Sequence, residues 1–157
     1  MQPQFDVLIV DDDAAIRETL RALFEDDGYF VREAADGLTA LHFLHTVNRP
    51  QVVITDYQMP RMDGFGLIGY VALDEDLRTR NRFICLTANA HRISQQFGTT
   101  LRNLHVPVIN KPFDIEDVIN AVDAAAAQLT CPREQFPKHH WREPLPQNQA
   151  FSSPHGQ

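Results

Sequence analysis

The regular alternation of two kinds of segment constrains the fold of this chain most strongly. Five short apolar runs of strand length alternate with five segments in which apolar residues recur at helical spacing. The expected strands cover residues 5–10, 29–33, 51–55, 82–86 and 106–109. Strands that alternate with helices in this way form βαβ units, in which the strands are parallel and helices cover both faces. We therefore predict an α/β fold with a doubly wound, five-stranded parallel sheet.

The helices between the strands have recognisable starts and stops. The first carries Ile16 to Phe24 and ends at Gly28, and the second opens at Asp36-Gly37 and ends before Pro50. The third, roughly a dozen residues long, follows the turn-forming residues 59–64. The fourth covers residues 93–104, and the fifth is predicted to begin with Asp114 as its cap and to reach Leu129. Pro107 cannot donate a ladder hydrogen bond, so the strand at 106–109 is expected at an edge.

The composition changes after residue 129. Residues 4–129 are expected to form one domain, whereas residues 130–157 contain five of the ten prolines among Gln, His and Ser. Such a composition is typical of a disordered tail. Within it, His139-His140-Trp141 is expected to be solvated, with metal binding or a recognition peptide as alternatives.

Bulk properties exclude several classes of partner. The formal net charge of −7 argues against binding to nucleic acid or to an anionic membrane surface. No apolar run approaches the roughly 18–20 residues that span a bilayer. Cys85 and Cys131 offer neither a disulfide framework nor metal-ligand spacing, which fits a cytoplasmic protein.

Chemically useful side chains follow the predicted strands at their carboxyl ends, where parallel sheets bind ligands. They are Asp11 and Asp12, Asp56, Thr87, and Lys111. Two carboxylates about 5 Å apart repel by roughly 3 kcal/mol at an effective dielectric near 20, so such a cluster must be protonated, be spread into water, or be neutralised by a cation. Hard oxygen ligands favour Mg²⁺. An ammonium and a hydroxyl beside a metal-bound carboxylate would stabilise a phosphoryl group in transfer to that carboxylate.

Four motifs in order carry a family resemblance. The segment Val52–Gly64, which reads VVITDYQMPRMDG, resembles the phosphoacceptor segment of response-regulator receiver domains. Leu8–Asp13 resembles the acidic pocket of that family, Leu86–Ala88 its hydroxyl switch, and Asn110–Phe113 its lysine–proline turn. The similarity covers about residues 4–129. It implies the flavodoxin-like strand order 2-1-3-4-5.

The resemblance also implies roles for the residues that match. Asp56 would form an aspartyl phosphate, taking the group from a phosphohistidine on a sensor histidine kinase or phosphotransfer protein. Asp12, Asp56 and the backbone carbonyl of Gln58 would ligate Mg²⁺, and Asp11 would act mostly through water. Lys111 would pair with the phosphoryl oxygens.

Further residues are assigned in the same way. Thr87 would hydrogen-bond to the phosphoryl group and pull its loop inward, and Ala88 would keep the entry open. Gln58 and Asn89 hold the two positions that tune hydrolysis of the phosphoryl group. The bond before Pro112 is expected to be cis.

One position departs from the family pattern. Val108 stands where the family commonly has an aromatic side chain that swings inward with the threonine. We therefore expect activation to be read through the helix at 93–104 and the loop before it. By family analogy, a homodimer would form through that helix, the strand at 106–109 and the helix that follows.

The resulting hypothesis is a stand-alone response regulator of a two-component phosphorelay. It would be a phosphoprotein that switches partner binding and would not be an enzyme for outside substrates. Three alternatives stay open. A phosphatase or mutase with an aspartyl nucleophile would want a second acid where Gln58 stands. The others are a pseudo-receiver that binds partners without phosphorylation, and a fragment of a longer regulator or hybrid kinase.

Overall fold

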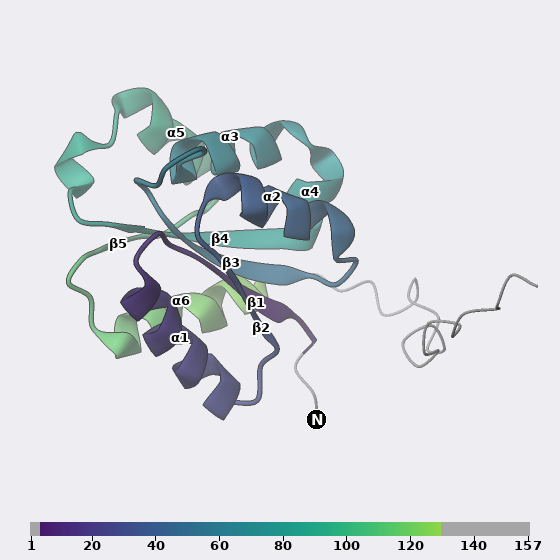
Figure 1. Cartoon of the computed structure of the whole chain (residues 1–157). Coiled ribbons are helices and arrows are strands. Elements are labelled where there is room, and N and C mark those ends of the chain that lie inside the picture. The colour runs from purple at the N-terminus through teal and green to yellow at the C-terminus, as the bar shows by residue number, and fades with distance from the viewer. Residues whose placement is uncertain (1–3, 130–157) are drawn as a thin grey trace, which may run out of the picture.

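The predicted strands form a single parallel sheet in a computed structural model that describes residues 4–129 (Figure 1). Its order is β2-β1-β3-β4-β5, which confirms the expected fold and order. The strands are β1 (Asp6–Val10), β2 (Val31–Ala34), β3 (Gln51–Asp56), β4 (Asn81–Thr87) and β5 (Val108–Asn110). The central strand β3 is buried along its whole length, as expected for a strand covered on both faces.

Helices cover both faces of the sheet, as Figure 1 shows. Helices α1 and α6 lie on one face, and α2, α3, α4 and α5 lie on the other. The bounds are α1 (Ala14–Asp26), α2 (Gly37–Thr46), α3 (Gly64–Leu73), α4 (Glu75–Arg80), α5 (Gln95–Asn103) and α6 (Ile115–Ala127), with a 3-10 turn, η1 (Ala90–Arg92), before α5. The two helical layers bury both faces of the sheet.

The hydrophobic core is divided by the alternation of side chains along the strands. Leu8, Val53 and Cys85 point toward the layer that contains α2 to α5. Val7 and Ile84 point toward α1 and α6. The sheet is therefore anchored on both sides, so that the residues at its carboxyl edge are held by rigid strands.

Several element ends differ from the expectation by one or two residues, as at β2, which begins at Val31 instead of Tyr29. Three further differences concern α3, β5 and α6. The third predicted helix is divided into α3 and α4, because the Asp74 side chain accepts a hydrogen bond from the Leu77 N–H and starts a new helix. Strand β5 begins at Val108 instead of Val106, with Pro107 just before it, although β5 does lie at the edge. Asp114 stands at the N-cap of α6, but its side chain makes no capping hydrogen bond.

Two expectations concern the ends of the chain and its relation to membranes. Residues 130–157, including His139-His140-Trp141, lie outside the described residues. Among residues 4–129, no helix has the length and apolar character required to cross a bilayer.

Candidate functional site

Three aspartates meet where strands β1 and β3 end. The two strands pair in parallel with Val10 opposite Thr55, so the residues that follow them emerge side by side. Asp11, Asp12 and Asp56 each offer a carboxylate oxygen, and these oxygens lie within 4.8 Å of one another. The sheet thus brings Asp56 beside two carboxylates that lie 44 and 45 positions before it in the chain.

The three carboxylates differ in how far they are already engaged. Asp11 is buried, and its two oxygens accept hydrogen bonds from the Asp13 N–H (2.8 Å) and the Lys111 ammonium (2.7 Å). Arg17 donates to the Asp11 backbone carbonyl at 2.7 Å and so holds the loop after β1. Asp12 is exposed. Asp12 and Asp56 are therefore the better placed of the three to bind a cation directly.

Lys111 extends from the end of β5 into this cluster. Its Nζ lies 3.4 Å from Oδ1 of Asp56 in addition to its contact with Asp11. Burial lowers the pKa of the Lys111 ammonium, but hydrogen bonding and charge attraction from Asp11 and Asp56 outweigh it, and the pKa is raised. Lys111 is therefore a fixed positive charge at neutral pH.

The environment of Asp56 makes its charge costly. Only 8% of the residue is exposed, and burial is the largest cause of its raised pKa. Asp11 raises the pKa further, while Lys111 and a backbone hydrogen bond from Gln58 lower it. A buried carboxylate with incomplete compensation is a group that an additional cation would stabilise.

The remaining predicted residues surround this cluster. Thr87 is buried at the end of β4, and its hydroxyl accepts a hydrogen bond from the Asn89 N–H at 3.1 Å. Its carbonyl accepts from the Lys111 N–H at 2.7 Å, which ties the ends of β4 and β5 together. Ala88, Asn89 and Gln58 are exposed. The bond before Pro112 is cis, as the sequence led us to expect.

A contact that the sequence did not predict holds the loop after β3. Asp36, which is fully buried and caps α2, is paired with the Arg61 guanidinium. Next to it, the Gly37 N–H donates to the Met62 carbonyl at 2.8 Å. Arg61 adopts a positive φ of 66°, which turns the loop toward α2. Asp36-Gly37 was recognised as a helix start, but the sequence gives no sign of its partner 25 positions away.

The donor set of the cluster fits a hard divalent cation. Its ligand atoms are carboxylate oxygens, without a sulfur or imidazole group among them, and this is the chemistry that Mg²⁺ prefers. A carboxylate beside such a cation and an ammonium can act as a nucleophile toward phosphorus, because both positive charges stabilise the oxygens of the group in transfer.

Comparison with known proteins identifies the family. The sequence model of the response regulator receiver domain matches residues 7–123, which is most of the chain. The chain belongs to the response regulator receiver domain family. As a receiver domain, it is similar to the sporulation initiation phosphotransferase F of Bacillus subtilis (strain 168). The two are 36% identical over 117 residues, or 74% of this chain and 89% of that protein.

Solved receiver structures share the fold. The chemotaxis response regulator CheY4 of Vibrio cholerae superimposes with a TM-score of 0.65 at 27% identity, covering 78% of this chain and 98% of that one. The response regulator TrrA of Thermotoga maritima, solved in complex with Mg²⁺-BeF, gives a TM-score of 0.65 at 25% identity, covering 80% and 99%.

The curated relatives differ from one another in how much of their length this receiver domain matches. It spans 89% of the Bacillus protein but only 25 to 28% of several other relatives. A receiver domain alone and a receiver domain within a longer regulator are thus both represented among its relatives.

Proposed function

We propose that this receiver domain is a stand-alone response regulator that accepts a phosphoryl group on Asp56. The donor is a phosphohistidine on a sensor histidine kinase or a phosphotransfer protein. A carboxylate oxygen of Asp56 forms the new bond to phosphorus as the bond from phosphorus to the histidine nitrogen breaks, and the electron pair and a proton remain with the imidazole. The position of Asp56 supports this proposal most strongly, because Asp56 lies beside Asp12 and 3.4 Å from the Lys111 ammonium.

The acidic cluster would bind Mg²⁺ through Asp12, Asp56 and the backbone carbonyl of Gln58, with Asp11 contributing through water. The hydrogen bonds that Asp11 already makes to Asp13 and Lys111 support its indirect role. Bound there, the ion supplies positive charge that offsets the charge on the carboxylates and on the phosphoryl oxygens.

The chain's own residues would complete the site. Lys111 would hold one phosphoryl oxygen by its ammonium, and Thr87 would donate its hydroxyl proton to another. The small side chain of Ala88 would leave the entry open. Gln58 and Asn89, both exposed amides, would orient or obstruct the water that removes the phosphoryl group.

Phosphorylation would act by shifting a two-state equilibrium that a partner protein reads. Thr87 now uses its hydroxyl oxygen to accept from the Asn89 N–H. A new bond from Thr87 to the phosphoryl group would therefore pull on the loop that leads to η1 and α5. The association surface that we propose for a partner or a second copy comprises α5, β5 and α6.

Intact mass measurement tests this proposal. The full chain and its Asp56→Asn variant are incubated with acetyl phosphate and Mg²⁺, and each again with EDTA. We expect one added phosphoryl group on the wild type with Mg²⁺ only. An unmodified wild-type chain that still binds its partner would instead indicate a pseudo-receiver.

A further inference from the structure

Helix α3 exposes an apolar surface at its C-terminal end. The helix has no charged side chain from Gly64 to Leu73. A helix that is apolar all round is normally covered on all sides by protein. In the described part of the chain, however, Leu73 is 92% exposed and Tyr70 is 44% exposed. This end of α3 therefore has an apolar face available for a binding partner.

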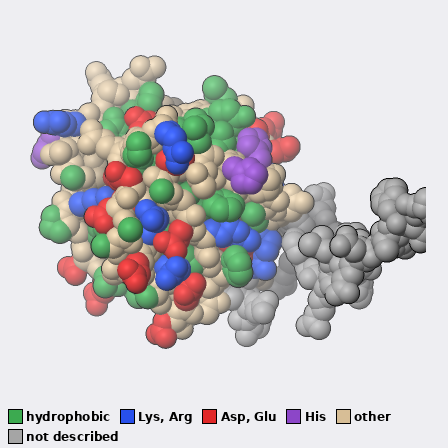
Figure 2. All heavy atoms as spheres, viewed as in Figure 1, with side chains coloured by type: hydrophobic (Ala, Val, Ile, Leu, Met, Phe, Trp, Pro, Cys, Tyr) green, Lys and Arg blue, Asp and Glu red, His purple; other side chains and the backbone are tan. Residues whose placement is uncertain are grey.

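Acidic residues border the same surface. One shallow hollow of about 560 Å³ lies here, and we call it the α3–α4 hollow. It is lined by Tyr70, Leu73, Asp74, Glu75 and Asp76. Figure 2 shows hydrophobic, histidine and acidic side chains meeting at the edge of the molecule where α2, α3 and α4 lie. The ion pairs found within residues 4–129 do not involve the carboxylates of Asp74, Glu75 or Asp76. The hollow thus suits a segment that combines aromatic and basic side chains.

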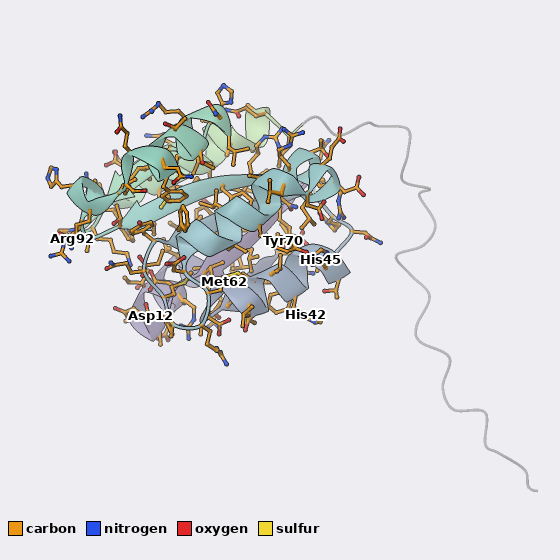
Figure 3. The ribbon with its side chains drawn as sticks, turned by 90° about the horizontal axis from the view of Figure 1, so that it is seen from above. Asp12, His42, His45, Met62, Tyr70 and Arg92 are labelled. Atoms are coloured by element: carbon orange, nitrogen blue, oxygen red, sulfur yellow. The ribbon has the colours of Figure 1, made fainter. Side chains whose placement is uncertain are left out.

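The chain leaves the described domain at the same end of the molecule. Gln128 lines one cavity of about 270 Å³ together with Val71 of α3 and Arg78 of α4, whereas Leu129 lies with Phe5 and Pro50 in another hollow. The described chain therefore ends on the α1 and α6 side of the sheet, with Gln128 near the end of α3. This end lies away from the carboxylate site, and Figure 3 shows Tyr70 and His45 beside one another and distant from Asp12. A segment that follows residue 129 can therefore reach the hollow without crossing the site of Asp56.

We propose that residues 136–142 of this chain dock in the α3–α4 hollow. Their sequence is Phe-Pro-Lys-His-His-Trp-Arg, in which two cations enclose two histidines and Trp141. Trp141 would pack on Leu73 and Tyr70, and Lys138 and Arg142 would face the carboxylates of residues 74–76. The nine residues from Thr130 to Lys138 can span about 30 Å, which is enough for an intramolecular contact.

The docked segment would be an interaction independent of phosphoryl transfer. The hollow lies at the amino ends of the strands, opposite the carboxyl ends that carry Asp56. Docking would cover the exposed end of α3 and leave the carboxylate cluster open. Failure of this proposal would therefore leave the proposed function intact, and the reverse also holds.

Trp141 provides a direct test, because it is the only tryptophan of the chain. In the full-length protein we expect its emission to be blue-shifted, and its quenching constant with acrylamide to be about twofold smaller, relative to N-acetyltryptophanamide. Leu73→Ser should return both values to those of the free compound. Leu38→Ser removes another exposed leucine, on α2, and should leave them unchanged.

Charge and concentration complete the test. The double variant Glu75→Lys, Asp76→Lys should also release Trp141, and high salt should weaken docking of the wild type. The proposal is overturned if the native chain and N-acetyltryptophanamide give the same emission and quenching, or if Leu73→Ser and Leu38→Ser behave alike. A blue shift that disappears on dilution would assign the hollow to a second copy and would equally overturn intramolecular docking.

Discussion

Lys111 and Asp11, which are 100 positions apart in the sequence, are joined by a 2.7 Å hydrogen bond at the carboxyl edge of the sheet. The same ammonium lies 3.4 Å from Asp56. Because Asp11 is engaged by Lys111 and by the Asp13 N–H, the carboxylates better placed to bind a cation are those of Asp12 and Asp56. One lysine thus distinguishes the roles of three neighbouring aspartates.

Replacing this lysine should affect both stability and phosphoryl transfer. Lys111→Ala leaves Asp11 and Asp56 without their shared cation, so we expect a loss of about 1–3 kcal/mol in the free energy of unfolding without Mg²⁺. The rate of phosphorylation by acetyl phosphate should fall about 100-fold or more. Lys111→Arg should recover most of the stability but little of the rate, because a planar guanidinium does not reproduce a point charge. Urea unfolding and timed mass spectra measure the two effects, and an Ala variant phosphorylated at the wild-type rate would refute the role of Lys111.

The charge of Asp56 should reduce the stability of the metal-free protein. Burial, with a smaller contribution from Asp11, raises the pKa of Asp56 above its unfolded-state value. The folded state therefore binds the proton more tightly, and stability is lost as pH rises from the unfolded-state pKa through the folded-state pKa. Asp56→Asn should therefore be more stable than the wild type at pH 7. The difference should vanish below about pH 3.9, where the carboxyl is protonated in both states.

Urea unfolding across this pH range, without Mg²⁺, measures the difference. Glu18→Gln alters an exposed carboxylate on α1 and serves as the matched control, for which we expect no comparable gain. Equal stability of Asp56→Asn and the wild type at pH 7 would mean that the buried charge is fully compensated.

Two glycines of helix α3 should respond oppositely to the same substitution. A Cβ on Gly64 would clash with the backbone oxygen of Asp56, so the backbone beside the phosphoacceptor must shift. Gly64→Ala should destabilise the fold by about 1–3 kcal/mol and slow phosphorylation. A Cβ on Gly69 meets nothing within 4 Å, and Gly69→Ala should stabilise the helix by about 0.5–1 kcal/mol without changing the rate. Thermal unfolding and the acetyl phosphate reaction compare the pair, and a normal rate in Gly64→Ala would contradict the tight fit.

Activation should be visible in α5 and should not depend on Val108. Val108 is 37% exposed on the edge strand β5, where a small side chain can reorient without repacking the core. Addition of beryllofluoride and Mg²⁺ should shift the amide resonances of η1 and α5, residues 90–103, through the loop that Thr87 controls. Val108→Ala should retain these shifts, whereas Thr87→Ala should lose most of them. Unchanged resonances in α5 of the liganded wild type would rule out this route.

The sequence predicted the sheet, its order and the meeting of Asp11, Asp12, Asp56 and Lys111 at the strand ends, because these depend on local patterns and on four ordered motifs. The break between α3 and α4 was missed, although Asp74 precedes two acidic residues that favour a helix start. The apolar helix α3 ends directly before Asp74, so the helical spacing of apolar residues alone did not reveal a new helix start. The start of β5 was placed too early, because Val106 is buried in the core without being part of the strand.

Contacts between side chains that are distant in the chain could not be predicted from the sequence. The pairing of Asp36 with Arg61 depends on the path of a loop and on a positive φ at Arg61, and neither follows from periodicity. Likewise, the hydrogen bond from Arg17 to the Asp11 carbonyl depends on how α1 packs beside β1. These contacts hold the loops that carry the site, so they determine its geometry without belonging to a recognisable motif.

The most direct measurement is the position of the phosphoryl group in the chain. After reaction with acetyl phosphate and Mg²⁺, borohydride reduces an aspartyl phosphate to homoserine, and peptide mass spectrometry then locates the altered residue. We predict homoserine at position 56 of the wild type and none in Asp56→Asn. Homoserine at Asp11 or Asp12, or no altered aspartate at all, would contradict the assignment of Asp56 as the phosphoacceptor.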